Sequence, residues 1–270
     1  MAAPGSVRII TGDARRMPGI IQDSVALVVT SPPYPMIPQW DELFASWGAT
    51  GFEEMHRQLD RVWAECYRVL LPGGILAVNI GDAVRTVSGE FRLWPNHARM
   101  IDAAERLGFR SLPYILWKKP TNKPNAFLGS GFLPPNAYVT LDCEFILLFR
   151  KGSLRRLPPG SSARLASRYR REERDLWFSQ VWEDIRGARQ SRAGRRSGAF
   201  PPEIPRRLIR MFSIIGDTVL DPFAGTGTTL WTASSLGRHA IGIEIDRVRA
   251  HDLENEQRLR RRTPTAGRVD

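Results

Sequence analysis

One stretch near the C-terminus constrains the fold more than any other part of the sequence. Residues 218–246 contain a short β-branched run, a glycine-rich turn, a helical segment and a second apolar run, all within 29 residues. This is the length and order of one strand–helix–strand crossover, the unit that joins two parallel strands. The chain is therefore predicted to build a parallel sheet with helices on its faces.

The rest of the chain largely repeats this alternation. Strands are predicted at Val7–Thr11, Val25–Thr30, 75–80, 112–117, 143–149, 218–220 and 239–243. Helices are predicted at 52–71, 94–107, 163–177, 202–212, 228–236 and 246–260. The first of these helices is expected to end at Pro72-Gly73-Gly74. The pattern predicts an α/β fold with a mostly parallel sheet flanked by helices.

Composition narrows the class of protein. The 270 residues and the 42% hydrophobic content suffice for a large core. The two cysteines, Cys66 and Cys143, have no paired spacing, which excludes a disulfide framework or a cysteine-rich zinc site. The histidines are scattered, so no metal site is expected. The sequence shows neither a signal peptide nor an apolar run of membrane-spanning length, so a cytoplasmic protein without membrane contact is expected.

The net charge of +11 is concentrated in one segment. Residues 150–210 contain 17 Lys plus Arg and 6 Asp plus Glu, whereas the remaining residues hold 22 of each sign. Almost all of the basic residues are Arg, which favours bidentate contacts with phosphate or guanine. The segment therefore indicates a nucleic-acid partner, although a solvated basic loop would show the same charge.

The glycine turn favours a nucleoside ligand. It reads Asp221-Pro222-Phe223-Ala224-Gly225-Thr226-Gly227-Thr228, and Glu244 follows nineteen residues after Gly225. Glycines let a ligand approach the backbone, and an acidic residue at this distance can bind ribose hydroxyls. There is no P-loop lysine and no third glycine at the dinucleotide spacing. A nucleoside without phosphate remains, which suggests S-adenosylmethionine; a plain tight turn is the simpler alternative.

A second turn, Thr30-Ser31-Pro32-Pro33-Tyr34, follows the predicted strand at Val25–Thr30. The prolines stiffen the turn and remove two N–H donors, so the Ser31 hydroxyl and the Pro32 carbonyl are presented as acceptors. Two acceptors on the exocyclic amine of a base would favour its pyramidal, nucleophilic form. Tyr34 would stack on the base once it is flipped out of the duplex. A proline-stiffened surface turn is the alternative.

Together these two turns resemble the amino-group DNA methyltransferases. TSPPY is similar to the catalytic motif of that family and DPFAGTGTT to its cofactor motif, and their order resembles the circularly permuted β-class. The resemblance implies a Rossmann-like methyltransferase fold that binds S-adenosylmethionine. It also implies that Asp13 lies near the adenosine end of the cofactor and that Phe200 and Pro201 lie near the methionine end.

The resemblance divides the chain into four parts. Residues 1–119 would be the catalytic half, 120–199 an inserted target-recognition region, 200–260 the cofactor-binding half, and 261–270 a tail. Double-stranded DNA would be the substrate, and a homodimer and a cognate restriction endonuclease are the further partners expected. The basic residues taken as DNA contacts are Lys118, Lys119, Arg155, Arg156, Arg189, Arg192, Arg195 and Arg196.

The target base is predicted as cytosine, modified at N4, because relatives with Ser at the first motif position mostly carry that activity. Adenine N6 is the alternative. Cytosine C5 methylation would need a reactive cysteine turn, which neither Cys66 nor Cys143 offers. An RNA or small-molecule methyltransferase would not need both the Ser-Pro-Pro-Tyr turn and the Arg-rich segment. A simple DNA-binding module would have no use for Glu244, and a nuclease would need clustered carboxylates.

Overall fold

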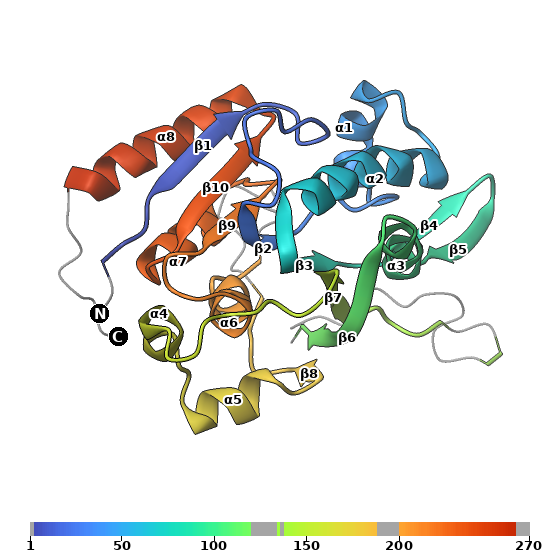
Figure 1. Cartoon of the computed structure of the whole chain (residues 1–270). Coiled ribbons are helices and arrows are strands. Elements are labelled where there is room, and N and C mark those ends of the chain that lie inside the picture. The colour runs from blue at the N-terminus through green and yellow to red at the C-terminus, as the bar shows by residue number, and fades with distance from the viewer. Residues whose placement is uncertain (1–2, 120–133, 136–137, 188–199, 263–270) are drawn as a thin grey trace.

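The computed structural model describes residues 3–119, 134–135, 138–187 and 200–262 (Figure 1). Within these residues, eight strands form one sheet in the order β1-β10-β9-β2-β3-β7-β6-β8. Their bounds are β1 (Val7–Thr11), β2 (Val25–Thr30), β3 (Leu70–Ile80), β6 (Phe109–Lys118), β7 (Cys143–Lys151), β8 (Val181–Trp182), β9 (Thr218–Asp221) and β10 (His239–Glu244). The α/β class predicted from the sequence is confirmed.

The sheet is parallel except around one strand. From β1 through β10, β9 and β2 to β3 every pairing is parallel. Strand β7 runs antiparallel to both β3 and β6, and β8 pairs parallel with β6. As a result, the first strand of the chain lies beside the last, and the two predicted motifs come from neighbouring strands.

Helices cover both faces of the sheet (Figure 1). Helices α2 (Phe52–Val69) and α3 (Asn96–Arg106) cover one face, and α6 (Glu203–Phe212), α7 (Thr228–Ser235) and α8 (Arg247–Arg262) the other. Strand β2 is buried along its whole length, with Val28 in the first hydrophobic cluster and Leu27 in the second. Among the described helices none is long and apolar enough to cross a membrane.

The strand order reverses direction between β2 and β9. From β9 the chain passes through α7 to β10 on one side, and from β2 it passes through α2 to β3 on the other. Right-handed crossovers in opposite directions put α7 and α2 on opposite faces. A crevice therefore opens at the carboxyl ends of β2 and β9, where open α/β sheets bind their ligands.

Several predicted boundaries differ from the structure. The helix predicted at 52–71 ends at Val69, and the next strand starts at Leu70 instead of Ile75. Pro72, Gly73 and Gly74 lie inside this strand, where the pairing register shifts between Val25 and Leu27 of β2. The turn-forming residues therefore make an irregularity within a strand and not a loop.

Several short elements were not predicted from the sequence. Strands β4 (Ala83–Val87) and β5 (Glu90–Trp94) form a hairpin, so α3 begins at Asn96 and not at Trp94. The turn of the hairpin, Ser88-Gly89, has positive φ at both residues, which is the conformation of a tight hairpin turn. The helix predicted at 163–177 is divided into α4 (Ser162–Ala166) and α5 (Arg171–Trp177). Two short helices, η1 (Pro38–Trp40) and α1 (Asp41–Ser46), follow β2.

Two arginines of the basic segment are paired with carboxylates of the same segment. Arg207 is buried and bonds to Asp184 and Glu203, and Arg210 bonds to Glu173. The four-part division of the chain stays a prediction, but β7 and β8, which fall within the predicted insert, are strands of the central sheet.

The prediction that Arg155 contacts DNA is not supported by its position. Its guanidinium forms two hydrogen bonds with Asp217, at 2.6 and 2.8 Å. Asp217 precedes β9, so the pair lies at the edge of the sheet opposite the crevice. Arg156 is exposed beside it and shares that edge.

Two tryptophans anchor the basic segment to the core. Trp177 and Trp182 are each 1% exposed. The indole N–H of Trp182 donates to the Trp177 carbonyl at 3.0 Å, and the Arg207 guanidinium lies 5.0 Å from the Trp182 ring centroid. Both tryptophans are therefore structural residues.

We expect Trp182→Ala to lower the free energy of unfolding by about 3–5 kcal/mol, because it leaves a large cavity in a buried cluster. Urea unfolding measured by far-UV circular dichroism would test this. Leu165→Ala is the matched control in the same segment, since Leu165 is 56% exposed, and should change stability by less than about 0.5 kcal/mol. Equal unfolding midpoints for both variants would contradict the assignment.

Candidate functional site

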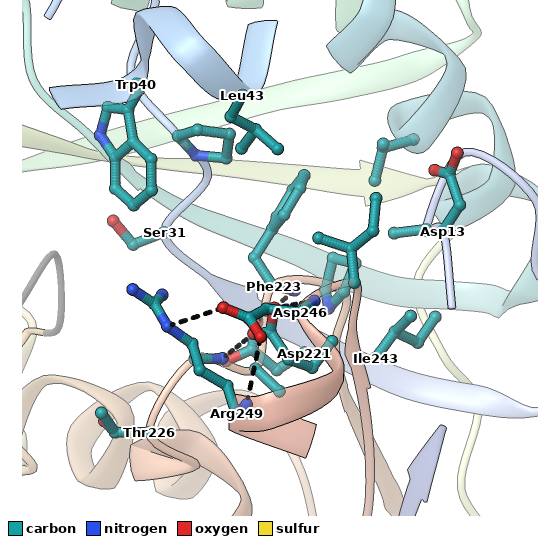
Figure 2. Close-up of a pocket in the computed structure, with 18 of the residues that line it drawn as sticks. Asp13, Ser31, Trp40, Leu43, Asp221, Phe223, Thr226, Ile243, Asp246 and Arg249 are labelled. Atoms are coloured by element: carbon teal, nitrogen blue, oxygen red, sulfur yellow. Dashed lines mark hydrogen bonds and ion pairs between the residues drawn. The ribbon is translucent and has the colours of Figure 1, made fainter. Parts of the chain in front are cut away.

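A cavity of about 400 Å³ lies at the carboxyl ends of the central strands (Figure 2). Its volume is within the range of small-molecule sites. Of the residues predicted for the site, the following line it: Asp13, Ser31, Pro33, Phe200, Asp221, Pro222, Phe223, Ala224, Gly225, Thr226, Thr228 and Glu244. Thr30, Pro32, Tyr34, Pro201 and Gly227 lie next to these residues in sequence and do not line the cavity.

The glycine turn has the backbone conformation that the sequence predicts. Gly225 and Gly227 have φ of +53° and +79°, a region that disfavours residues with a side chain. A Cβ on Gly227 would lie 2.6 Å from Trp231 Nε1 and 2.7 Å from Leu253 Cδ2. A Cβ on Gly225 would meet only the Phe223 carbonyl oxygen, at 3.7 Å. Gly227 is thus required for packing, whereas Gly225 leaves the cavity side open.

The carboxylate of Glu244 holds the glycine turn against the end of β10. Its two oxygens accept hydrogen bonds from the backbone N–H groups of Gly225, at 2.8 Å, and Asp246, at 2.9 Å. Each carboxylate oxygen can accept a second bond. The group lines the cavity although it is almost fully buried. It is therefore placed to accept two hydroxyl groups from a ligand.

Asp221 and Thr30 join the two motif-bearing strands. The Thr30 hydroxyl donates to Asp221 Oδ1 at 2.6 Å, and the Phe223 N–H donates to the same oxygen at 3.0 Å. Burial raises the pKa of Asp221 to about 6, against the opposing effect of these hydrogen bonds. Thr30 is fully buried, so it acts on the site through Asp221.

The Ser-Pro-Pro-Tyr turn brings Ser31 to the cavity and turns Tyr34 toward the core. Figure 2 shows Ser31 beside Trp40 at one end of the pocket and Asp13 at the other. Ser31 Oγ lies 3.1 Å from the Tyr34 hydroxyl. That hydroxyl also contacts Asn79 and Glu144. Burial, followed by the negative charge of Glu144, raises the pKa of Tyr34 well above its ordinary value.

Some lining residues were missed by sequence reasoning. Trp40 and Trp47 line the cavity, together with Leu43, Val62 and Arg249, and none of them was predicted for the site. Asn79 and Glu144 were not singled out. Asn79 is a polar residue within the buried run of β3, and Glu144 is a charged residue just before the buried run of β7. The role of such residues can be assigned only when the side chains that they contact in the fold are known.

The predicted DNA contacts are distributed unevenly. Lys118 is exposed at the end of β6, on the same edge of the sheet as the cavity. The Lys119 ammonium pairs with Glu144 and lies 4.8 Å from the Trp117 ring centroid. Arg189, Arg192, Arg195 and Arg196 lie outside the described residues. In the described part of the chain, no cluster of His, Cys, Asp or Glu could hold a metal ion.

Comparison with known proteins connects this geometry to a family. The family model described as DNA methylase (N6/N4) matches residues 25–255. The chain is 58% identical over 265 residues to the type II methyltransferase M.MjaI of Methanocaldococcus jannaschii, covering 89% of this chain and 87% of that one.

Two solved structures have a similar fold. One is a Thermus thermophilus protein in complex with S-adenosyl-L-methionine, and its name describes it as a DNA modification methylase. It has a TM-score of 0.76 and 36% identity and covers 95% of this chain and 94% of that one. The other is the PvuII DNA methyltransferase, named as cytosine-N4-specific, with a TM-score of 0.68 and 19% identity, covering 93% and 86% of the two chains. The second similarity concerns the fold alone.

The raised pKa of Asp221 predicts a pH-dependent loss of stability. A folded-state pKa of about 6 against an ordinary value of 3.8 means that the buried carboxylate destabilises the fold when ionised. Its contribution to stability is present below about pH 4 and is lost as the pH rises through about 6. The difference in the free energy of unfolding between Asp221→Asn and the wild type should therefore shift in favour of Asp221→Asn by about 2–3 kcal/mol between about pH 4 and pH 7.

Urea unfolding of both proteins across this pH range is the measurement. Thr30→Val removes a hydrogen bond that opposes the rise in pKa, so it should enlarge the pH dependence. If the free energy of unfolding changed with pH by the same amount in the wild type and in Asp221→Asn, the assigned pKa would be wrong.

Proposed function

This chain belongs to the N6/N4 family of DNA methylases, and we propose that it transfers a methyl group to the exocyclic N4 amine of a cytosine in double-stranded DNA. It is a DNA methyltransferase that uses S-adenosylmethionine. The cytosine N4 target is our proposal. The observation that supports methyl transfer in this cavity is that Ser31 and Glu244, from two distant motifs, both line it.

The residues around the cavity fit S-adenosylmethionine. Glu244 keeps one free lone pair on each carboxylate oxygen, which suits the two hydroxyls of a ribose. The open side of Gly225 allows a ligand to approach the backbone closely. Asp13, at the end of the cavity away from Ser31, would contact the adenosine (Figure 2). Phe200, which is buried and lines the cavity, would contact the methionine part, with Pro201 behind it.

When bound, S-adenosylmethionine supplies an electrophilic methyl group on a sulfonium. The chain must then make a weakly nucleophilic amine able to attack. We assign the two acceptors to the Ser31 hydroxyl and the Pro32 carbonyl, which would each accept one N–H of the amine. The Thr30–Asp221 hydrogen bond fixes the strand that carries these acceptors relative to the glycine turn. Fixed orientation of this kind raises the rate because the reacting groups lose little further entropy on the way to the transition state.

The choice of cytosine rests on the type of acceptor. Ser31 offers a neutral hydroxyl where adenine-modifying relatives mostly have Asp or Asn. Trp40 lies beside Ser31 in the cavity and offers an aromatic surface for a flipped base (Figure 2). Tyr34, for which the sequence predicted this stacking, does not line the cavity, and its hydroxyl contacts Asn79 and Glu144. Stacking on an aromatic side chain contributes about 1–3 kcal/mol per base.

We place DNA contacts on the carboxyl edge of the sheet. Ile185 and Phe200, which flank the Arg-rich residues 188–199, belong to one buried cluster. Phe200 lines the cavity and the Ile185 carbonyl accepts from Trp117 at the end of β6. We propose that Lys118 contacts DNA there. Arg189, Arg192, Arg195 and Arg196 lie outside the described residues, and their contact with phosphates or bases stays a prediction from the sequence. A homodimer and a cognate restriction endonuclease stay predictions from the family resemblance.

Nucleoside mass spectrometry of DNA from cells that express this chain tests the target base. We expect N4-methylcytosine to appear, because the acceptor in the motif is Ser31. Cells that express Ser31→Ala provide the control and should show little modified base. N6-methyladenine without N4-methylcytosine would refute the cytosine assignment and establish the adenine alternative.

Two variants should separate methyl transfer from cofactor binding. Ser31→Ala should lower kcat about a hundredfold, as loss of a preorganised hydrogen bond does, and leave the Kd for S-adenosylmethionine within about twofold. Glu244→Ala should instead raise that Kd about tenfold or more, because charged hydrogen bonds to the ribose are lost. Calorimetry and a methyl-transfer assay give the two readouts. Unchanged turnover in Ser31→Ala, or unchanged affinity in Glu244→Ala, would remove the respective role.

A further inference from the structure

A chain of polar side chains leads from Ser31 into the core. Ser31 Oγ lies 3.1 Å from Tyr34 Oη, which lies 3.1 Å from Glu144 Oε2 on β7. Asn79 on β3 donates from its amide nitrogen to both the Tyr34 hydroxyl, at 2.8 Å, and Glu144 Oε2, at 2.6 Å. Asn79 is buried, and the side chain of Glu144 is 13% exposed. The chain joins the target-amine motif to the antiparallel strand of the sheet.

The hydrogens in this chain can be assigned from chemistry alone. The ionised carboxylate of Glu144, paired with the Lys119 ammonium, has no hydrogen and can only accept. The single hydroxyl hydrogen of Tyr34 must therefore point at Glu144. Asn79 presents its amide nitrogen, since its amide oxygen would repel the carboxylate. That oxygen is buried and has no hydrogen-bond partner in the described part of the chain.

This assignment determines the role of Ser31. With the Tyr34 hydrogen directed at Glu144, the contact between the two hydroxyls requires Ser31 to donate. Both lone pairs of Ser31 Oγ then remain free toward the cavity. If Glu144 were absent, Tyr34 could rotate its hydrogen toward Ser31 and occupy one of these lone pairs.

We propose that Glu144 is a positioning residue, which acts through Tyr34 to hold Ser31 as a hydrogen-bond acceptor for the target amine. The inference rests on the proposed function, in which Ser31 accepts from that amine. Glu144 itself touches neither the amine nor the cofactor in this role. The competing explanation is that Glu144 serves only to pair with Lys119.

A double-mutant cycle separates the two explanations. Glu144→Ala should lower the single-turnover rate of methyl transfer to PCR-amplified, unmethylated DNA by about tenfold to a hundredfold, while the Kd for S-adenosylmethionine stays within about twofold. Tyr34→Phe should have a smaller effect, because it removes the competing donor together with the orienting contact. Since Glu144 acts only through the Tyr34 hydroxyl, the double variant should be faster than Glu144→Ala and equal to Tyr34→Phe.

Two further variants complete the design. Glu144→Gln should keep a rate near that of the wild type, because its amide oxygen still accepts from Tyr34. Glu173→Ala is the matched control: Glu173 is a similarly buried carboxylate, 10% exposed and paired with Arg210, and its loss should leave the rate unchanged. If Glu144→Ala does not fold, as judged by circular dichroism, Glu144→Met keeps the side-chain volume and replaces it in the cycle.

The outcomes are distinct. A rate unaffected by loss of Glu144, or a loss of the same size in the wild-type and Tyr34→Phe backgrounds, would overturn the proposal and leave Glu144 as a partner of Lys119 only. Failure of the proposed function shows separately, in protein with Glu144 intact, as unchanged turnover of Ser31→Ala or as N6-methyladenine in the product.

Discussion

The hydrogen bond between Thr30 and Asp221 is the contact on which the site depends most. It spans β2 and β9, the two strands at which the order of the sheet reverses, and both partners are buried. Burial raises the pKa of the Asp221 carboxyl to about 6, so the arrangement has an energetic cost. In return, the end of the strand that carries Ser31 is held at a defined distance from the turn that carries Gly225. Methyl transfer between two bound groups requires this kind of fixed geometry.

The arginines of the basic segment serve two purposes. Arg207, Arg210 and Arg155 neutralise carboxylates within the fold and fasten the segment to α6 and to the start of β9. Their positive charge is therefore mostly compensated locally and contributes little to attraction of DNA. Lys118 is exposed on the edge of the sheet where the cavity lies, and it is the described cation that we propose to contact the duplex. A count of charge along the sequence does not separate these two groups, since pairing depends on which carboxylates the fold brings near.

The antiparallel strand β7 adds a contribution that the parallel part of the sheet cannot make. Because it runs against its neighbours, its first residues lie at the carboxyl ends of β3 and β6, beside the Ser-Pro-Pro-Tyr turn. Glu144 reaches Tyr34 only for this reason. In the parallel strands it is the last residues that lie at that edge. The antiparallel strand thus supplies a carboxylate beneath the turn.

The sequence by itself determined the fold class, most of the strands and helices, both motifs and the family. These features are local: they depend on periodicity, on glycines at positive φ such as Gly225, and on spacing such as that from Gly225 to Glu244. Tertiary structure alone decided the rest. Trp40 lines the cavity, Arg155 lies at the opposite edge of the sheet, and Glu144 contacts Tyr34, which is 110 residues away in the chain. The physical reason is that burial and pairing depend on contacts between distant segments, which no local pattern contains.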